Sequence, residues 1–220
     1  MKIAIMQPYF FPYIGYFQLM NAVDIWVNMD HATFIKKGFM HKNSVADNQI
    51  IRIPLLGASQ NLNTREIQVD YNSKLLHKLS ITLEHRYAKA PYYQVGKSIL
   101  AKCIESQPAH LSAFNWQLIE QIHSYLGMTT TLVETSIGLT SQKKADGMIE
   151  IAKKFDANEI INPIGGSQLY DKSYFREKGL EINFLNMAVK SEEDKWSIFH
   201  HLCHYSADQI QERLTEFELS

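Results

Sequence analysis

The chain has 220 residues, of which 45% are hydrophobic and 20% are charged. This composition is typical of an ordinary globular protein and excludes a disordered or low-complexity chain. Its 22 Lys and Arg residues balance 23 Asp and Glu residues, so the net charge of −1 supplies no broad positive field, and we expect no general nucleic-acid binding.

Membrane insertion is not expected either, because no apolar run approaches the roughly 20 residues that span a bilayer. Met1 leads directly into a strand-like segment without the layout of a signal peptide, so we expect a cytoplasmic protein. Cys103 and Cys203 lie in separate segments without metal-site or disulfide spacing, and we interpret them as reduced core thiols. The composition leaves the oligomeric state open, including a homo-oligomer.

The first predicted unit is a strand, a loop and a helix. Residues 2–6 are predicted to form a short buried strand, residues 7–13 a loop rich in proline and aromatic residues, and residues 14–20 a helix whose entrance suits Pro12. A second β-favouring run covers residues 24–30. The pattern predicts a βαβ unit with two parallel strands.

The middle of the chain is predicted to be mainly helical. Residues 50–56 and 65–70 indicate a strand pair, and leucines recur at helical spacing from residue 72 onward. Pro91 and Pro108 divide this helical stretch into three helices.

Strands and helices alternate again toward the C-terminus. Strands are predicted at 132–135, 159–162 and 180–185, helices at 145–155 and 170–178, and mostly helix over 196–217. This alternation favours an α/β fold with a mostly parallel, Rossmann-like sheet. We therefore predict a single domain over residues 1–220 with a helical insertion near 72–128.

The loop after the first strand is the first place to look for a site, because ligands of open α/β sheets bind beyond the carboxyl ends of the strands. Gln7 offers an amide, and Gly15 permits close approach to the backbone near a helix start. Tyr9, Tyr13 and Tyr16 offer flat faces with hydroxyl groups, which suits a sugar or a nucleotide. The alternative is an aromatic loop that only caps the core.

Charged residues follow the second strand. Asp30, at its carboxyl end, is a candidate base or a ligand for a hydroxyl group, although a solvated or helix-capping Asp is the alternative. Lys37, Lys42 and Asn43 belong to a basic, polar loop that suits a diphosphate, with a merely solvated loop as the alternative.

The segment after the strand at 159–162 is glycine-rich. Asn162, Gly165, Gly166 and Tyr170 lie where a turn precedes a helix and where backbone N–H groups can hold an anion. The segment lacks the lysine of a P-loop and the glycine spacing of a dinucleotide-binding loop.

Two histidines raise the question of a metal site. His200 and His204 share a helix face, but they lack the glutamate and the further ligands of a zinc site. We therefore expect no metal, and the sequence identifies no cofactor.

Several motifs together resemble the WbqC-like protein family over nearly the whole chain. They are residues 6–17, Asp24, Asp30, residues 37–43, 87–92 and 162–170, and the segment Trp196-Ser-Ile198. Lys42 departs from the family's pattern, where an arginine often precedes the asparagine, and His201 departs where an acidic residue is common.

The resemblance implies a role in bacterial surface-polysaccharide synthesis, notably of O-antigen, with a nucleotide-linked sugar as the partner molecule. Our leading hypothesis is an acyl or aminoacyl transferase that acts on a nucleotide-linked amino sugar. In this hypothesis Asp30 and Gln7 carry the catalysis. The residues that bind substrate are Tyr9, Tyr13, Gly15, Tyr16, Lys37, Lys42, Asn43, Asn162, Gly165, Gly166 and Tyr170. The alternatives are a non-catalytic sugar-nucleotide or partner-binding module, and a nucleotidyl- or adenylate-forming transferase. The last follows from a fainter likeness to nucleotidyltransferase and synthetase folds, in which Tyr13 and Tyr16 take the places of paired histidines around Gly15.

Overall fold

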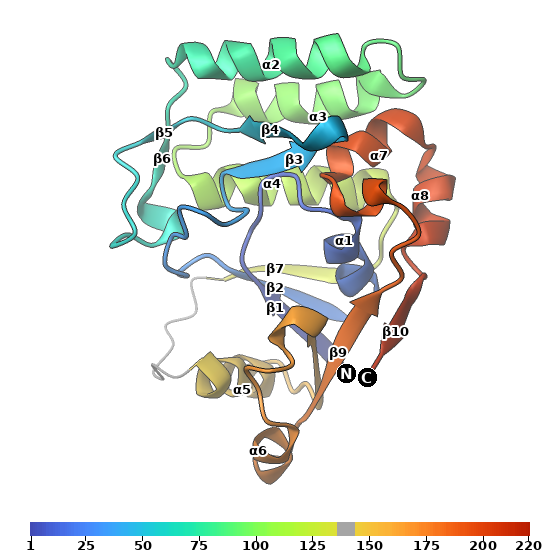
Figure 1. Cartoon of the computed structure of the whole chain (residues 1–220). Helices are drawn as coiled ribbons and strands as arrows, with labels where there is room; N and C mark the ends of the chain where they lie inside the picture. Colours follow the sequence, from blue (N-terminus) through green and yellow to red (C-terminus); the bar gives the residue numbers. More distant parts are fainter. Residues whose placement is uncertain (136–143) are drawn as a thin grey trace.

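The computed structural model describes residues 1–135 and 144–220, which are built around a mainly parallel sheet (Figure 1). Its six strands lie in the order β10-β9-β8-β1-β2-β7. Neighbouring strands are parallel except for β9 and β10, so the predicted α/β fold with a mostly parallel sheet is confirmed. The strands are β1 (Lys2–Met6), β2 (Ile25–Met29), β7 (Thr131–Thr135), β8 (Glu159–Pro163), β9 (Glu181–Met187) and β10 (Phe217–Leu219).

The strand order has a reversal point next to β1. Counted along the chain, the sheet strands run 3-2-1-4-5-6, which is the order of doubly wound nucleotide-binding sheets. The chain leaves β1 toward β2 and β7, then returns to place β8 on the other side of β1. In such sheets the ligand crevice lies at the carboxyl ends of the two strands that flank the reversal, here β1 and β8.

The central strands are apolar because both faces of the sheet are covered. On β1, Ile3 and Ile5 pack into one core cluster, whereas Ala4 between them packs into the other. Such strands show a continuous apolar run instead of alternation, which is why β1 is readily found in the sequence.

Helices cover the sheet on both sides (Figure 1). The core on one side draws on α1 (Ile14–Asn21), α4 (Leu111–Tyr125), α7 (Ile198–His204) and α8 (Ala207–Arg213). The core on the other side draws on α5 (Lys144–Lys154) and α6 (Lys172–Glu177). Within the described residues, no helix combines the length and the apolar character needed to cross a membrane.

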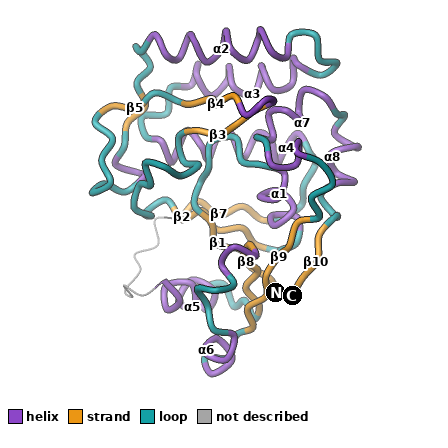
Figure 2. The backbone as a smooth tube through the Cα atoms, viewed as in Figure 1, coloured by secondary structure: helices purple, strands orange, loops and turns teal. Residues whose placement is uncertain are grey.

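A further helical layer lies over the first of these faces, as the tube in Figure 2 shows. It contains α2 (Lys74–Tyr87) and α3 (Tyr93–Ser106). With α4 they are the three helices predicted between residues 72 and 126, and Pro91 and Pro108 separate them as expected.

Two small antiparallel sheets connect this layer to the main sheet. They pair β3 (Lys42–Val45) with β4 (Gln49–Arg52), and β5 (Leu55–Leu56) with β6 (Gln68–Val69). The expected pairing of segments 50–56 and 65–70 therefore holds for β5 and β6, but β4 pairs with β3. β3 is not predicted from the sequence because its polar residues Lys42, Asn43 and Ser44 do not resemble a strand.

The C-terminal segment is mostly helical, as predicted, but the helix is divided into α7 and α8. Ser197 and Ser206 each cap a separate short helix, with the Ser197 hydroxyl accepting from Phe199 N–H and the Ser206 hydroxyl from Gln209 N–H. The chain then ends in β10, which pairs with β9. Three residues are too few to show strand periodicity, so only the neighbouring strand reveals β10.

Candidate functional site

The loop after β1, residues 7–13, lies at the reversal point of the sheet and is held from three sides. Its backbone carbonyls accept hydrogen bonds from side chains on α1, β3 and α4, which come from distant parts of the sequence. The Tyr16 hydroxyl donates to Gln7 O (3.0 Å), the Asn43 amide to Phe11 O (2.7 Å) and the Asn115 amide to Pro8 O (2.9 Å). The position of the loop is therefore set by the core, as a binding loop requires.

Some tyrosines of this region pack in the core, and others remain accessible at the surface. Tyr16 is buried, and its ring centroid lies 4.6 Å from that of Trp26. Tyr9 and Tyr13 are half-buried and remain accessible. Burial raises the pKa of Tyr9 and Tyr13, so near neutral pH their hydroxyl groups are neutral donors.

Gly15 allows a close approach, but the approaching groups belong to the protein. A Cβ atom at this position would lie 2.4 Å from the Tyr13 ring and 2.9 Å from Met187 Sδ. The glycine therefore lets the Tyr13 ring fold back over the start of α1, next to the end of β9.

At the end of β2, Asp30 is only 8% exposed, and the Thr64 hydroxyl donates to its backbone carbonyl. His31 Nδ1 lies 3.6 Å from Asp30 Oδ1, too far for a hydrogen bond but close enough for an ion pair when the imidazole is protonated. Neither atom has a hydrogen-bond partner among the described residues. The sequence predicts Asp30 as a site residue but not His31, whose only signal is its place beside that carboxylate.

Asn28 was also missed. It lies within β2, is 1% exposed, and neither atom of its amide has a partner in the described part of the chain. Its backbone is in register with Met6 on β1, one residue before Gln7. The available signal was a single amide inside the apolar run Ile25-Trp-Val-Asn-Met29.

At the end of β8, Asn162 is 9% exposed and packs against Gly166 in the 3-10 turn η3 (Ile164–Gly166). Tyr170 is half-buried and contacts Phe175, whereas Gly165 is exposed. The helix that follows, α6, is capped by the chain itself, because the Asp171 carboxylate accepts from Ser173 N–H at 2.9 Å. The glycine segment therefore forms a 3-10 turn and does not itself begin the helix.

The remaining predicted residues lie in and after the loop between β2 and β3. Lys37 is exposed, Lys42 is half-buried, and Asn43 is buried and holds the β1 loop. Burial, together with Lys42 and Arg52, lowers the pKa of His41 to about 4, so this imidazole is neutral near neutral pH.

The strand pairing brings the polar residues at the ends of β1, β2 and β8 to one edge of the sheet. Met6 lies beside Asn28, and β1 pairs with β8 on its other side. Gln7 and Asp30 therefore follow β1 and β2, and Asn162 lies near the end of the adjacent β8. Side-chain alternation places Asn28 on the same face as Trp26, toward α1, and Asn162 on the same face as Ile160, toward α5. This edge, with Gln7, Asp30, His31 and Asn162, is our candidate site.

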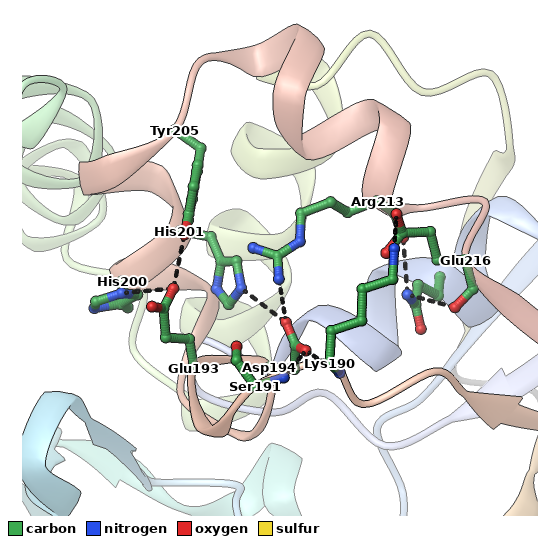
Figure 3. Close-up of polar contacts among 10 residues, drawn as sticks. Lys190, Ser191, Glu193, Asp194, His200, His201, Tyr205, Arg213 and Glu216 are labelled. Carbon is green, nitrogen blue, oxygen red and sulfur yellow. Dashed lines mark hydrogen bonds and ion pairs between the residues drawn. The ribbon is translucent and has the colours of Figure 1, made fainter.

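A second polar cluster joins α7 and α8 to the 3-10 turn η4 (Glu192–Lys195), as Figure 3 shows. Asp194 is 3% exposed and accepts from Arg213 and from the backbone N–H groups of Lys190 (2.8 Å) and Ser191 (3.0 Å). Burial alone would raise the pKa of Asp194. The neighbouring His201, the two N–H groups and the Arg213 guanidinium outweigh it, so the pKa lies below its ordinary value.

His200 is part of this cluster (Figure 3). Its Nδ1 lies 3.2 Å from the Tyr87 hydroxyl and its Nε2 lies 3.4 Å from Glu193 Oε2. Burial and the neighbouring His204 and His201 lower the pKa of His200 to about 4, although Glu193 opposes the shift. Among the residues that the structure describes, no group of three or more His, Cys, Asp or Glu side chains could hold a metal ion. We interpret this cluster as structural.

Comparison with known proteins points to one family. The model of the WbqC-like protein family matches residues 7–201, a stretch that begins at the candidate site and ends in α7. The chain is 23% identical over 200 residues to "Uncharacterized protein Rv1507c" of Mycobacterium tuberculosis. The aligned residues cover 84% of this chain and 82% of that protein. No solved structure matches the chain significantly.

Proposed function

Because the chain belongs to the WbqC-like protein family, we propose that it is an enzyme of bacterial surface-polysaccharide synthesis, notably of O-antigen. In this proposal it transfers an acyl or aminoacyl group to a nucleotide-linked amino sugar. The single observation that carries the catalytic part is the pair Asp30 and His31, with Nδ1 and Oδ1 3.6 Å apart, at the end of the strand next to β1. A buried carboxylate beside an imidazole is a suitable general base, and this pair follows the strand next to the reversal point of a doubly wound sheet.

The proposed transfer uses Asp30 to move one proton. The amino nitrogen of the sugar attacks the carbonyl carbon of an activated acyl donor, and a C–N bond forms as the bond to the donor's leaving group breaks. Asp30 accepts the proton from the nitrogen and returns it to the leaving group. The His31 imidazole lies 3.6 Å from this carboxylate, and the Thr64 hydroxyl anchors the Asp30 backbone.

The other site residues are proposed to bind substrate. The accessible Tyr9 and Tyr13 would contact the sugar or the base through neutral donors and flat faces, whereas Gln7 stays with Asp30 in the proposed catalytic pair. Lys37 and Lys42 would bind the diphosphate. Asn162 and its neighbouring glycines would line the site at the end of β8.

The first experiment is a thermal-shift screen of the intact chain against nucleotide-linked amino sugars, free nucleotides, coenzyme A and acyl-coenzyme A. A ligand of the folded state raises the apparent melting temperature by mass action. We expect stabilisation by a nucleotide-linked sugar. No shift with any compound would contradict the proposed substrate class.

The catalytic role is tested with two isosteric changes on the same strand. Asp30→Asn should lower kcat by about 10²- to 10⁴-fold, as expected for a lost general base. Asp24→Asn is the matched control, because Asp24 lies at the other end of β2, where its carboxylate accepts from Lys2 N–H at 2.7 Å. Retained turnover in Asp30→Asn would overturn the assignment. Tight binding without turnover of any donor would support a non-catalytic binding module instead. Pyrophosphate exchange with ATP or CTP would support a nucleotidyl transferase.

A further inference from the structure

Asn28 is an unusual residue for the middle of this sheet. Its side chain is 1% exposed, yet neither its donor nor its acceptor has a partner among the described residues. Burying an amide in this way costs free energy comparable to a lost hydrogen bond. Packing alone would be served better by an apolar residue, as at Val27 beside it.

Two other buried asparagines show what a structural amide does in this protein. Asn43 donates to Phe11 O at 2.7 Å, and Asn115 donates to Pro8 O at 2.9 Å and to Met40 O at 2.7 Å. Both amides hold a backbone segment in place. Asn28 holds none, so its polarity calls for another explanation.

The location of Asn28 supplies one. It lies beside Met6, next to the loop that begins with Gln7. Asp30 follows two residues later, in the turn at the carboxyl end of β2, so the two side chains belong to the same strand end. Asp30 Oδ1 is likewise buried and unpartnered in the described part of the chain.

We propose that Asn28 is a ligand-binding residue and that, together with Asp30, it binds two neighbouring hydroxyl groups of a sugar. A hydroxyl group both donates and accepts, the Asn28 amide offers one of each, and an ionised Asp30 only accepts. Two adjacent hydroxyl groups satisfy both side chains at once. The inference rests on the proposed function for the identity of the ligand. The two hydroxyl groups belong either to the amino sugar that accepts the acyl group or to the ribose of its nucleotide.

The experiment compares Asn28→Leu, which is close in shape but apolar, with the wild-type chain. Without ligand, we expect its melting temperature to rise by about 2–6 °C, since an unsatisfied buried group is removed. If Asn28→Leu does not fold, Asn28→Val is used in its place. Asn115→Leu should instead lower the melting temperature because two hydrogen bonds are lost, and the exposed Asn72→Leu should leave it unchanged. A fall in the melting temperature of both Asn28 variants would overturn the inference, whatever binds.

The second measurement is the Kd of the nucleotide-linked sugar found by thermal shift, with UDP and dTDP as probes of the ribose, because dTDP lacks the ribose diol. We expect Asn28→Leu to weaken binding of the nucleotide-linked sugar at least tenfold and Asn72→Leu to leave it unchanged. If Asn28→Leu also weakens the binding of UDP, but not that of dTDP, the diol belongs to the ribose. An unchanged Kd would overturn the inference while the proposed function stands. Stabilisation by Asn28→Leu with no sugar bound by the wild-type chain would overturn both the proposed function and the diol.

Discussion

The amide of Asn162 lies so close to Gly166 that a Cβ atom added at Gly166 would stand 2.1 Å from Asn162 Nδ2. The backbone of Gly166 is not in the left-handed region, so the glycine is required for space and not for its conformation. This contact joins the end of β8 to the turn that follows it and sets the direction of the Asn162 amide.

We therefore expect Gly166→Ala to displace Asn162. Overpacking at a buried position costs about 1–3 kcal/mol, and a shift of about 1 Å at a site can lower kcat/KM by roughly 10²-fold. Gly165→Ala is the matched control for stability, since nothing lies within 4 Å of a Cβ atom there. Urea denaturation of the two variants decides the question, and equal stability would show that the contact does not matter.

The second prediction concerns Asn43, which we placed in the predicted substrate-binding set and which holds the β1 loop. Asn43→Ala removes the hydrogen bond to Phe11 O and leaves that carbonyl without its partner. The free energy of unfolding should fall by about 1–3 kcal/mol. Asn61→Ala, in an exposed turn, should change it by less than about 0.5 kcal/mol. If Asn43→Ala proves as stable as the wild-type chain, the loop is held in another way.

A third prediction tests the buried ion pair of Asp194 with Arg213. Asp194→Ala leaves the guanidinium and two backbone N–H groups without their acceptor, so we expect a loss of about 3–5 kcal/mol in the free energy of unfolding. The neighbouring Glu192 is exposed, and Glu192→Ala should be nearly neutral. Chemical denaturation measures both, and similar values would argue against a structural role for this cluster.

The fourth prediction is a pH dependence of stability. The pKa of His200 is lowered from 6.5 to about 4, so between these values the unfolded chain binds a proton that the folded chain does not. Stability should therefore fall as the pH drops from about 6.5 to 4, with a slope of up to about 1.4 kcal/mol per pH unit for this group. Lowered pKa values of His41, His123 and His201 act in the same direction.

The contribution of His200 is isolated by His200→Gln, in which the slope between pH 6.5 and 4 should be shallower. The matched control is His77→Gln, which removes an exposed imidazole from α2, away from His200. The comparison uses the slope alone, because either change can also alter packing. Parallel stability curves for wild type and His200→Gln would show that His200 does not titrate in this window.

The sequence by itself determined most of the sheet and its helices. β1, β2 and β8 are apolar runs that are covered on both faces, and the three helices of the middle segment show leucines at helical spacing between prolines. These signals are local, since each element carries its own periodicity and its own breakers. The candidate site after β1 is predicted from the same pattern, because ligands of doubly wound sheets bind at the carboxyl ends of the strands.

Tertiary structure alone decided what the individual polar residues do. Asn43 and Asn28 look alike in the sequence, yet one donates to a loop carbonyl and the other has no partner in the described residues. The pairing of β4 with β3, the short strand β10 and the contact of Asn162 with Gly166 likewise depend on neighbours brought close by folding. A hydrogen bond or a close contact is a property of two groups in space, and residue type and spacing describe only one of them at a time.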